Sequence, residues 1–200
     1  MLKAFENLID WTNVLLFHSV HESFFPHLEK IVTNKYSGQC QTYPGILFTL
    51  PAEKNNLLDL VTTPKNIITH KLNAADVPTL VSTWRFADKE SIQQLTECVN
   101  HSKSITVCTS DKDDLELKKV LKSWAVLSPI GAINLLRTDE RFRKQGLGAF
   151  TIKEISLRKI EAELVPIGEI ETFNDASGSL FTKVGFEKAY NTLWLYLTRS

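Results

Sequence analysis

The amino-acid sequence predicts an α/β fold, because short strand-like runs and longer helical stretches alternate along its 200 residues. Two patterns indicate this alternation: apolar and β-branched runs typical of strands, and longer segments with apolar residues at helical spacing. Gly and Pro residues separate these segments. In the C-terminal half we expect strands at 104–109, 122–127 and 132–137, a helix at 146–164, a strand at 167–172, a helix at 176–184 and a strand at 191–197.

Turn residues predict several boundaries in this half. Ser128-Pro129-Ile130-Gly131 has the composition of a hairpin turn, and the polar stretch 110–114 is expected to be a loop. Pro166 forbids continuation of the helix before it. Gly185 stands where a left-handed residue ends a helix, and Phe186 can fold back onto the last turn.

The N-terminal half has a weaker pattern. Apolar residues at helical spacing occur through residues 1–35, and Pro26 marks a break or the start of a helix. The further expected elements are a turn at Ser37-Gly38, strands at 45–50 and 66–72, and a helix at 87–100 with Ile92, Leu95 and Val99 on one face. No internal repeat or low-complexity tract is present in the sequence.

Composition limits the classes of partner. Lys plus Arg and Asp plus Glu both number 23, so the formal net charge is zero, and neither nucleic acid nor a membrane is expected as a partner. A small anionic ligand needs only a local cluster of charges and amides. Cys40, Cys98 and Cys108 show no zinc-binding spacing, so we expect reduced thiols and no metal.

The sequence also predicts a location. No apolar run is long enough to cross a bilayer. The first residues carry Glu6 and Asp10 and no arginine, which argues against a secretory signal and a mitochondrial transit peptide. We expect a cytoplasmic protein, with a mitochondrial location as the alternative.

The segment 135–149 carries the strongest chemical signal, because a strand runs into a tight loop that opens a helix. The first N–H groups of a helix have no intrahelical partner, and the helix dipole adds partial positive charge there, so a phosphate or pyrophosphate can bind. Gly146 and Gly148 lack a Cβ and would let an anion approach these amides, while Arg143 and Lys144 add positive charge.

The alternative interpretation of this segment is a glycine-containing turn without a ligand. Arg143-x-x-Gly146-x-Gly148 is a weak pattern when it stands alone. The spacing matches neither the dinucleotide-binding fingerprint nor the P-loop.

The sequence resembles the GNAT superfamily of N-acyltransferases in two places. Arg143-x-x-Gly146-x-Gly148 is similar to the acyl-CoA-binding signature, and Asn174-x-x-Ser177-x-x-Leu180-Phe181-x-x-x-Gly185-Phe186 is similar to the second signature. Further resemblance to the glycine N-acyltransferase-like branch lies in residues 124–127, 131–133 and 141–148. The resemblance covers residues 85–200 as the acyl-CoA-binding core, and residues 1–84 would form an extension that shapes the acceptor side.

The resemblance implies a mixed, mostly antiparallel twisted sheet flanked by helices, with splayed central strands. It implies transfer of an acyl group from acetyl-CoA or a longer acyl-CoA to a small amine, with an amino acid such as glycine as one candidate. The implied coenzyme contacts are the pyrophosphate loop (Arg143, Lys144, Gln145, Gly146, Leu147, Gly148, Ala149), the pantetheine strand (Leu136, Arg137, Thr138), and Asn174 and Ser177. Asn174 and Ser177 can equally serve the start of a helix, for which Asn is a favoured cap.

Proton transfer needs other groups, because two family positions are changed. Phe181 stands where many members have a tyrosine acid, and Ala132 stands where a glutamate base is expected in the branch. Glu169 and Glu171 lie two apart in a strand and face one side, where burial could raise a pKa; the alternative is two solvated carboxylates. Tyr190 is a further candidate acid.

Histidines supply weaker candidates. His70 and His101 could act as bases, although lone histidines are usually surface or core residues. His18, His21 and His27 are interpreted as a surface face, not as a metal site. Because Ala132 and Phe181 remove two expected groups, a non-catalytic acyl-CoA-binding or interaction module remains the alternative function.

Overall fold

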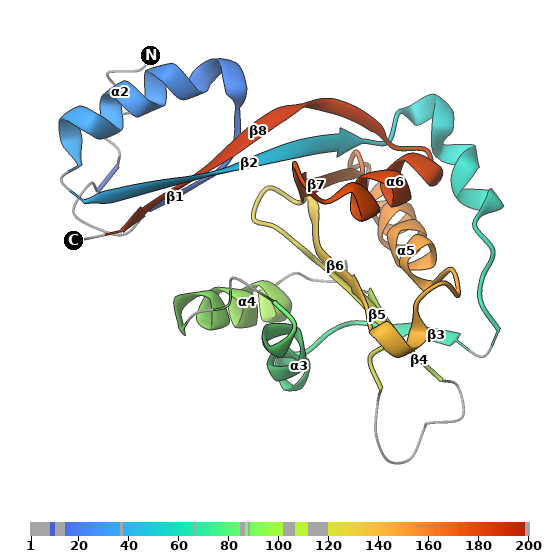
Figure 1. Ribbon diagram of the computed structural model, residues 1–200. Coiled ribbons are helices and arrows are strands. Elements are labelled where there is room, and N and C mark those ends of the chain that lie inside the picture. Colours follow the sequence, from blue (N-terminus) through green and yellow to red (C-terminus); the bar gives the residue numbers. More distant parts are fainter. Residues whose placement is uncertain are drawn as a thin grey trace. The chain divides into compact units, whose positions relative to one another are not determined.

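The computed structural model describes residues 9–10, 15–36, 38–65, 67–84, 87, 89–101, 107–111 and 120–198. The chain forms two compact units, and each contains strands and helices of a mixed, mostly antiparallel α/β fold (Figure 1). The first unit comprises residues 1–47, 169–174 and 188–200, and the second comprises residues 48–168 and 175–187. The fold class predicted from the sequence is confirmed.

The first unit combines elements from both ends of the chain. They are β1 (Leu15–His21), the 3-10 helix η1 (Glu22–Phe24), α2 (Phe25–Lys35), and most of β2 (Gln39–Thr49), β7 (Ile167–Glu171) and β8 (Glu187–Thr198). Their strand order is β1-β8-β2-β7, and β1 pairs antiparallel with β8. The buried core joins Leu28 and Val32 of α2 to Leu195 and Leu197 of β8.

The helical pattern expected through residues 1–35 is wrong for residues 15–21, which form β1. Pairing with β8 decides the structure of this short apolar run, whose spacing alone fits either a helix or a strand. Pro26 does mark a helix start, because it lies in the first turn of α2, where its missing N–H is tolerated. Residues 1–8, 11–14 and Ser37 lie outside the described residues.

The second unit contains the candidate coenzyme segment. Its elements are η2 (Ala52–Leu60), β3 (Ile67–His70), η3 (Ala74–Asp76), α3 (Val77–Ser82), α4 (Lys89–His101), β4 (Val107–Asp111), β5 (Ser123–Leu127), β6 (Ile133–Thr138), η4 (Glu140–Phe142), α5 (Leu147–Glu161) and α6 (Asp175–Lys183). Strands β3, β4, β5 and β6 are neighbours and run antiparallel. β6 runs parallel to β7 and pairs with it where Ile133 meets Gly168, at the start of both strands.

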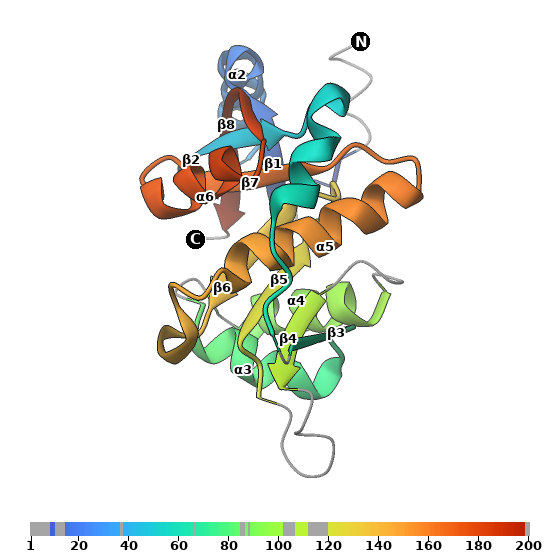
Figure 2. The ribbon, with the colours of Figure 1, turned by 90° about the vertical axis from the view of Figure 1, so that its right-hand side faces the viewer.

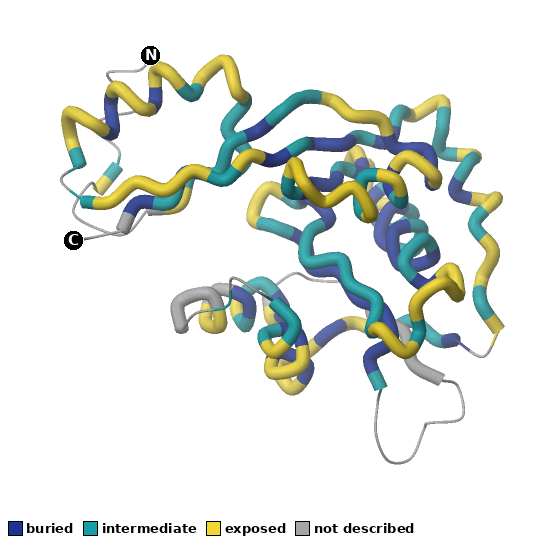
Figure 3. The backbone as a smooth tube through the Cα atoms, viewed as in Figure 1, coloured by how far each residue is buried: buried dark blue, intermediate teal, exposed yellow. Residues whose placement is uncertain are grey.

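Two groups of helices pack on this sheet: α5 alone, and α3 together with α4. α5 contacts β4, β5 and β6, as Figure 2 shows. Trp124 and Val126 of β5 pack instead with α3 and α4, in a cluster that includes Leu80 and Val99. Every residue of β5 is buried, and the burial-coloured tube in Figure 3 shows the dark core along this strand. The second unit therefore holds β6 between two packed layers.

Most predicted elements of this unit are confirmed, with the following differences. Ile92 is 39% exposed, so it does not share the buried face of Leu95 and Val99 on α4. Ser110 and Asp111 belong to β4 and not to the expected loop, while residues 112–119 lie outside the described part. α5 ends at Glu161, before Pro166, and the sequence pattern missed η2 and α3.

The turns predicted at Gly131 and Gly185 are confirmed. Gly131 has φ +77°, and its N–H donates to Ser128 O at 2.7 Å, which closes the hairpin between β5 and β6. Gly185 has φ +100° after α6. The N–H of Phe186 donates to Phe181 O at 3.0 Å, so the chain folds back onto the last turn as expected.

Candidate functional site

The loop between β6 and α5 is held by Asp139. Its side chain accepts a hydrogen bond from Arg141 N at 2.9 Å, and its two oxygens accept from Arg141 Nε at 3.0 Å and Nη2 at 2.9 Å. These hydrogen bonds lower the pKa of Asp139 to about 2. The N–H of Asp139 also donates to Lys122 O at 2.9 Å. The loop therefore leaves β6 in a fixed direction.

The start of α5 presents unpaired amides next to an exposed loop. Gly146 precedes the helix with φ +80°, and Lys144 has φ +62°. The helical bonds begin with Phe150 N donating to Gly146 O at 3.0 Å. The N–H groups of residues 147–149 therefore precede the first helical bond, and residues 143–146 are exposed. This arrangement can bind an anion.

Gly146 and Gly148 are glycines for two different structural reasons. Neither reason is the close approach of an anion that the sequence predicted. A Cβ on Gly146 would meet nothing within 4 Å, so its left-handed backbone is what requires glycine. A Cβ on Gly148 would lie 3.0 Å from Leu180 Cδ2 and 3.3 Å from Thr138 Oγ1. Gly148 therefore allows close packing of α5 against α6 and the end of β6.

The basic residues of the loop are only partly free for a ligand. Arg143 Nε donates to Thr138 O at 3.3 Å, and its Nη2 lies 3.3 Å from Glu140 Oε1. The side chains of Arg143 and Glu140 are both largely exposed, so an anion with more charge than Glu140 could compete with it for Arg143. Lys144 and Gln145 are exposed.

Buried hydroxyl groups connect α5 to the two strands below it. Thr151 Oγ1 donates to Ser123 Oγ at 2.8 Å, and Ser123 Oγ lies 3.2 Å from Thr138 Oγ1. Ser123 and Thr151 are fully buried. The chain of hydroxyls fixes the end of β6, where Leu136, Arg137 and Thr138 were predicted, relative to the start of α5.

β6 contains a bulge next to these predicted residues. Leu135 has φ +47°, and the register with β5 shifts at this point. The N–H of Leu135 donates to Asn134 Oδ1 at 2.7 Å. Arg137 Nη1 donates to Thr83 O at 3.1 Å, at the end of α3. The side chain of Arg137 therefore binds the end of α3.

Asn174 and Ser177 lie at the beginning of α6. The N–H of Asn174 donates to Glu171 O at 3.0 Å, and the helix begins at the next residue. Ser177 stands in the first turn of the helix and is partly buried. Asn174 belongs to the first unit and Ser177 to the second.

Among the predicted catalytic residues, Glu169 is held by several hydrogen bonds. It is 2% exposed, so the alternative of a solvated carboxylate is wrong for this residue. Its Oε1 accepts from Thr192 Oγ1 at 2.9 Å and Trp194 Nε1 at 2.7 Å, and its Oε2 accepts from Ser19 Oγ at 2.6 Å. His18 Nδ1 lies 3.5 Å from Oε2. All five residues belong to the first unit.

The pKa of Glu169 is lowered, in contrast to the increase expected from burial. Desolvation by burial raises the pKa of this carboxyl, but hydrogen bonds from His18, Ser19, Trp194 and Thr192 outweigh it. The residue is therefore an ionised hydrogen-bond acceptor. A carboxylate in this state orients neighbouring groups better than it accepts a proton.

The other predicted groups are less constrained. Glu171 is partly exposed on β7, and Tyr190 on β8 has its ring 4.7 Å from the ring of His21. His70 lies in β3 of the second unit, and the side chain of His101 lies outside the described residues. The sequence-based interpretation placed His18 on a surface face with His21 and His27, but its side chain is only 16% exposed. It gave no role to Ser19, because it assigned this segment to a helix.

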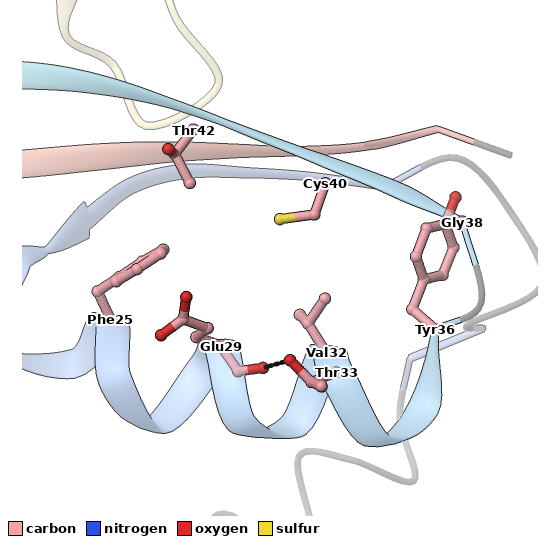
Figure 4. Close-up of a pocket in the computed structure, with 8 residues that line it drawn as sticks. All are labelled: Phe25, Glu29, Val32, Thr33, Tyr36, Gly38, Cys40 and Thr42. Atoms are coloured by element: carbon pink, nitrogen blue, oxygen red, sulfur yellow. Dashed lines mark hydrogen bonds between the residues drawn. The ribbon is translucent and has the colours of Figure 1, made fainter. Parts of the chain in front are cut away.

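The structure also contains a cavity of about 490 Å³ in the first unit, between α2 and β2. Figure 4 shows the Cys40 sulfur and the Glu29 carboxylate pointing into it. Burial, followed by the nearby charge of Glu29, raises the pKa of Cys40. The lining residues are Phe25, Glu29, Val32, Thr33, Tyr36, Gly38, Cys40 and Thr42. None of the predicted site residues lines this cavity.

Among the described residues, no three His, Cys, Asp or Glu side chains form a group that could hold a metal ion. In the same part of the chain, every helix falls short of the length and apolar character that crossing a bilayer requires.

Comparisons with known proteins agree with the geometry of the second unit. Residues 115–195 match the model of the family described as FR47-like protein. A search of curated proteins returned no match.

Solved structures show the fold of the whole chain. A Drosophila protein from a structural genomics consortium has a TM-score of 0.81 at 18% identity over 98% of this chain and 65% of its own. A GNAT-family acetyltransferase from Colwellia psychrerythraea has a TM-score of 0.56 at 10% identity, over 86% of this chain and 62% of its own. A GCN5-related N-acetyltransferase from Kribbella flavida has a TM-score of 0.55 at 14% identity, over 88% of this chain and 65% of its own.

These structures show that the chain has the GNAT fold. The chain spans about two thirds of the length of the Drosophila protein.

Proposed function

We propose that this GNAT-fold protein is a cytoplasmic, acyl-CoA-dependent N-acyltransferase. It transfers an acyl group from acetyl-CoA or a longer acyl-CoA to the amine of a small acceptor. The single observation that carries the proposal is the exposed turn at Gly146, which leaves the amides of residues 147–149 free at the start of α5. The FR47-like match over residues 115–195 and the acetyltransferase names of the structural neighbours support the same activity.

The coenzyme would bind along the segment from β6 to α5. The amides of residues 144–149 would hold the pyrophosphate, because they combine unpaired donors with the positive end of the helix dipole. Arg143 and Lys144 would add charge. The backbone of Leu136, Arg137 and Thr138 would contact the pantetheine arm, and Asn174 and Ser177 would bind it at the start of α6.

The acceptor would be a small amine, and the glycine N-acyltransferase-like branch suggests an amino acid such as glycine. Residues 1–84 would shape the acceptor side. In the reaction the amine attacks the thioester carbonyl directly. Correct orientation of both reactants would supply much of the rate enhancement. Backbone amides near the bulge of β6 would stabilise the oxyanion.

Glu169, Glu171 and Tyr190 are the candidate groups for proton transfer. Glu169 is the most firmly held of the three, because hydroxyl and indole groups donate hydrogen bonds to both of its carboxylate oxygens. Glu171 and Tyr190 are more accessible and could exchange protons with solvent.

Ligand binding tests the coenzyme site. Acetyl-CoA at about 100 times its dissociation constant should stabilise the protein by ~2.7 kcal/mol, which a thermal-shift titration measures. We expect Gly146→Glu to abolish this shift, because it places negative charge where the pyrophosphate binds. Gly146→Asn is the matched control, since Asn tolerates a left-handed backbone without a charge. Equal affinity for acetyl-CoA in wild type and Gly146→Glu would refute the site.

A second candidate function is a non-catalytic acyl-CoA-binding module. Ala132 and Phe181 favour this second function. Ala132 is buried at the position where a base is expected, and Phe181 is buried at the position where an acid is expected. A panel of acyl-CoAs and amines distinguishes the two functions. The enzyme releases free thiol with at least one amine, whereas the module binds acyl-CoA and releases none.

A further inference from the structure

The side chain of Arg137 in the second unit is held at one end and lacks an acceptor at the other. Its Nη1 donates to Thr83 O at 3.1 Å, at the residue that caps α3. Its Nε is buried and has no hydrogen-bond partner. A guanidinium carries several N–H donors, and a buried donor without an acceptor is destabilising. Nε therefore needs an acceptor that the chain itself does not supply.

Two observations place this side chain on the α3 face of β6. One is the contact with Thr83, and the other is that Arg137 lies opposite Trp124 in the pairing of β6 with β5. Directly opposite residues share a face of a sheet, and Trp124 packs in the apolar cluster with α3 and α4. Thr138 lies opposite Ser123, whose hydroxyl lies beneath α5. Successive residues therefore face opposite layers, and Arg137 points away from α5.

Within the described residues, Arg137 is a partly buried cation without an acidic partner. The acids of the adjacent loop are paired with other arginines. Asp139 accepts from Arg141 with both of its oxygens, and Glu140 Oε1 lies 3.3 Å from Arg143 Nη2. Partial burial weakens the screening of the charge on Arg137 by water, so this side chain attracts an anion more strongly than an exposed arginine would.

A carboxylate fits the unpaired edge of this guanidinium. Nε and Nη2 of an arginine form a planar fork that can donate to both oxygens of one carboxylate. The chain already uses this geometry at Arg141, whose Nε and Nη2 donate to the oxygens of Asp139 at 3.0 Å and 2.9 Å. On Arg137 the bond to Thr83 O occupies Nη1 and leaves the same fork for a ligand. A single cation beside the buried Trp124 matches a monoanionic carboxylate better than a phosphate.

We propose that the Nε and Nη2 edge of Arg137 binds the carboxylate of the acceptor, so that the acceptor is an amino acid and not a simple amine. This inference rests on the proposed function. The backbone of Arg137 belongs to the strand proposed to contact the pantetheine arm, while its side chain points away from α5, whose start would hold the diphosphate. A carboxylate bound there approaches β6 from the face opposite to α5, which suits the acceptor better than the acyl group. Thr83 lies within residues 1–84, the part expected to shape the acceptor side.

Acceptor specificity tests the proposal. Thiol release gives kcat/KM for matched pairs of amino acid and amino-acid amide, beginning with glycine and glycinamide, in which a neutral amide replaces the carboxylate. We expect Arg137→Gln to lower the ratio of glycine to glycinamide by about 10- to 100-fold, because the charge-assisted hydrogen bonds to the carboxylate are lost. Arg137→Lys should keep part of the preference, since the charge remains while the planar fork is lost.

Arg141→Gln is the matched control, because Arg141 already pairs with Asp139. It should leave the ratio unchanged. The ratio cancels every effect that acts equally on both acceptors, such as weaker binding of acetyl-CoA. Succinyl-CoA and butyryl-CoA, compared in the same way, test the acyl group as the source of the carboxylate. A preference for succinyl-CoA that Arg137→Gln removes would place the carboxylate on the acyl group and overturn its assignment to the acceptor.

NMR of the arginine Nε–H groups gives a readout that needs no turnover. Loss of a signal in Arg137→Lys identifies the one from Arg137, and we expect glycine to shift this signal while glycinamide does not. An equal response to inorganic phosphate, no response to glycine, or the same acceptor ratio in wild type and Arg137→Gln would overturn the carboxylate site. Absence of acetyl-CoA binding by the wild type would instead overturn the proposed acyl transfer, and a glycine-dependent shift at Arg137 would still identify the carboxylate site.

Discussion

Glu169 keeps its charge inside the first unit because its hydrogen bonds outweigh the loss of water. Trp194 and Thr192 supply donors to one oxygen, and Ser19 supplies a donor to the other. An unpaired carboxylate at 2% exposure would be protonated or expelled. The residue therefore links the three strands β1, β7 and β8 through polar contacts.

Stability should depend on pH through this residue. The pKa of Glu169 is lower in the folded protein than in the unfolded chain, so the unfolded chain binds more protons in acid. Its contribution is present above the unfolded pKa and is lost as pH falls through the folded pKa. We expect Glu169→Gln to lose about 1–3 kcal/mol at neutral pH, because an NH2 group replaces one of the two acceptor oxygens and leaves a buried donor unpaired. Urea unfolding across pH measures both effects, and parallel curves for the two proteins would contradict the assignment.

Sequence reasoning could select Glu169 but not its partners. Its spacing of two from Glu171 indicates a shared strand face, but the spacing leaves open whether that face is buried or solvated. Ser19 lies 150 positions away and Trp194 lies 25 away. Such contacts depend on which strands become neighbours, and no local pattern at His18 or Ser19 indicates that arrangement.

At the scale of elements, α5 is placed by its two opening glycines. Gly146 supplies the left-handed turn, and Gly148 lets the helix contact Leu180 of α6 and Thr138 of β6. The hydroxyls of Thr151 and Ser123 hold the same helix from below. The helix start is thus fixed in position by packing as well as by its turn.

A larger side chain at Gly148 should separate these elements. Gly148→Val is expected to lower the free energy of unfolding by about 1–3 kcal/mol, because the added methyl groups collide with Leu180 and Thr138. Combining it with Leu180→Ala makes room, so the double variant should lose less than the sum of the two single changes. Urea unfolding of the four proteins measures the coupling. Strict additivity would show that the two side chains do not meet.

The sequence predicted elements best where a turn residue bounds them. The hairpin at 128–131 and the helix predicted at 146–164 have clear glycine and proline signals; the hairpin is confirmed, and the helix forms at Leu147–Glu161. β1 lacks such signals, and its apolar residues fit a helix equally well. The spacing of Gly146 and Gly148 indicated the candidate anion-binding loop, whereas the bulges at Ser19 and Leu135 depend on strand pairing.

On the scale of the whole molecule, the first unit is assembled from three separate stretches of chain. Its core needs α2 from the beginning of the chain and β8 from the end. Closing such long loops costs conformational entropy, which apolar burial in this small core must offset. The stability of the unit therefore depends on a few buried contacts.

Removing one of these contacts should have a large effect. Leu195 of β8 is 0% exposed and packs with Leu28 and Val32 of α2 in the first unit. We expect Leu195→Ala to cost about 2–5 kcal/mol through lost burial and a cavity. Leu60→Ala is the control, because Leu60 is 77% exposed, and it should change stability by about 0.5 kcal/mol or less. Equal unfolding midpoints for the two variants would contradict the assigned core.

The turn at Gly146 has a kinetic consequence. Because the backbone at Gly146 is already in its left-handed form, the proposed site would offer preorganised donors to an arriving diphosphate. Association should then be limited by diffusion and orientation, without a slow conformational step. Stopped-flow traces of coenzyme A capture are expected to show one phase whose rate rises linearly with concentration.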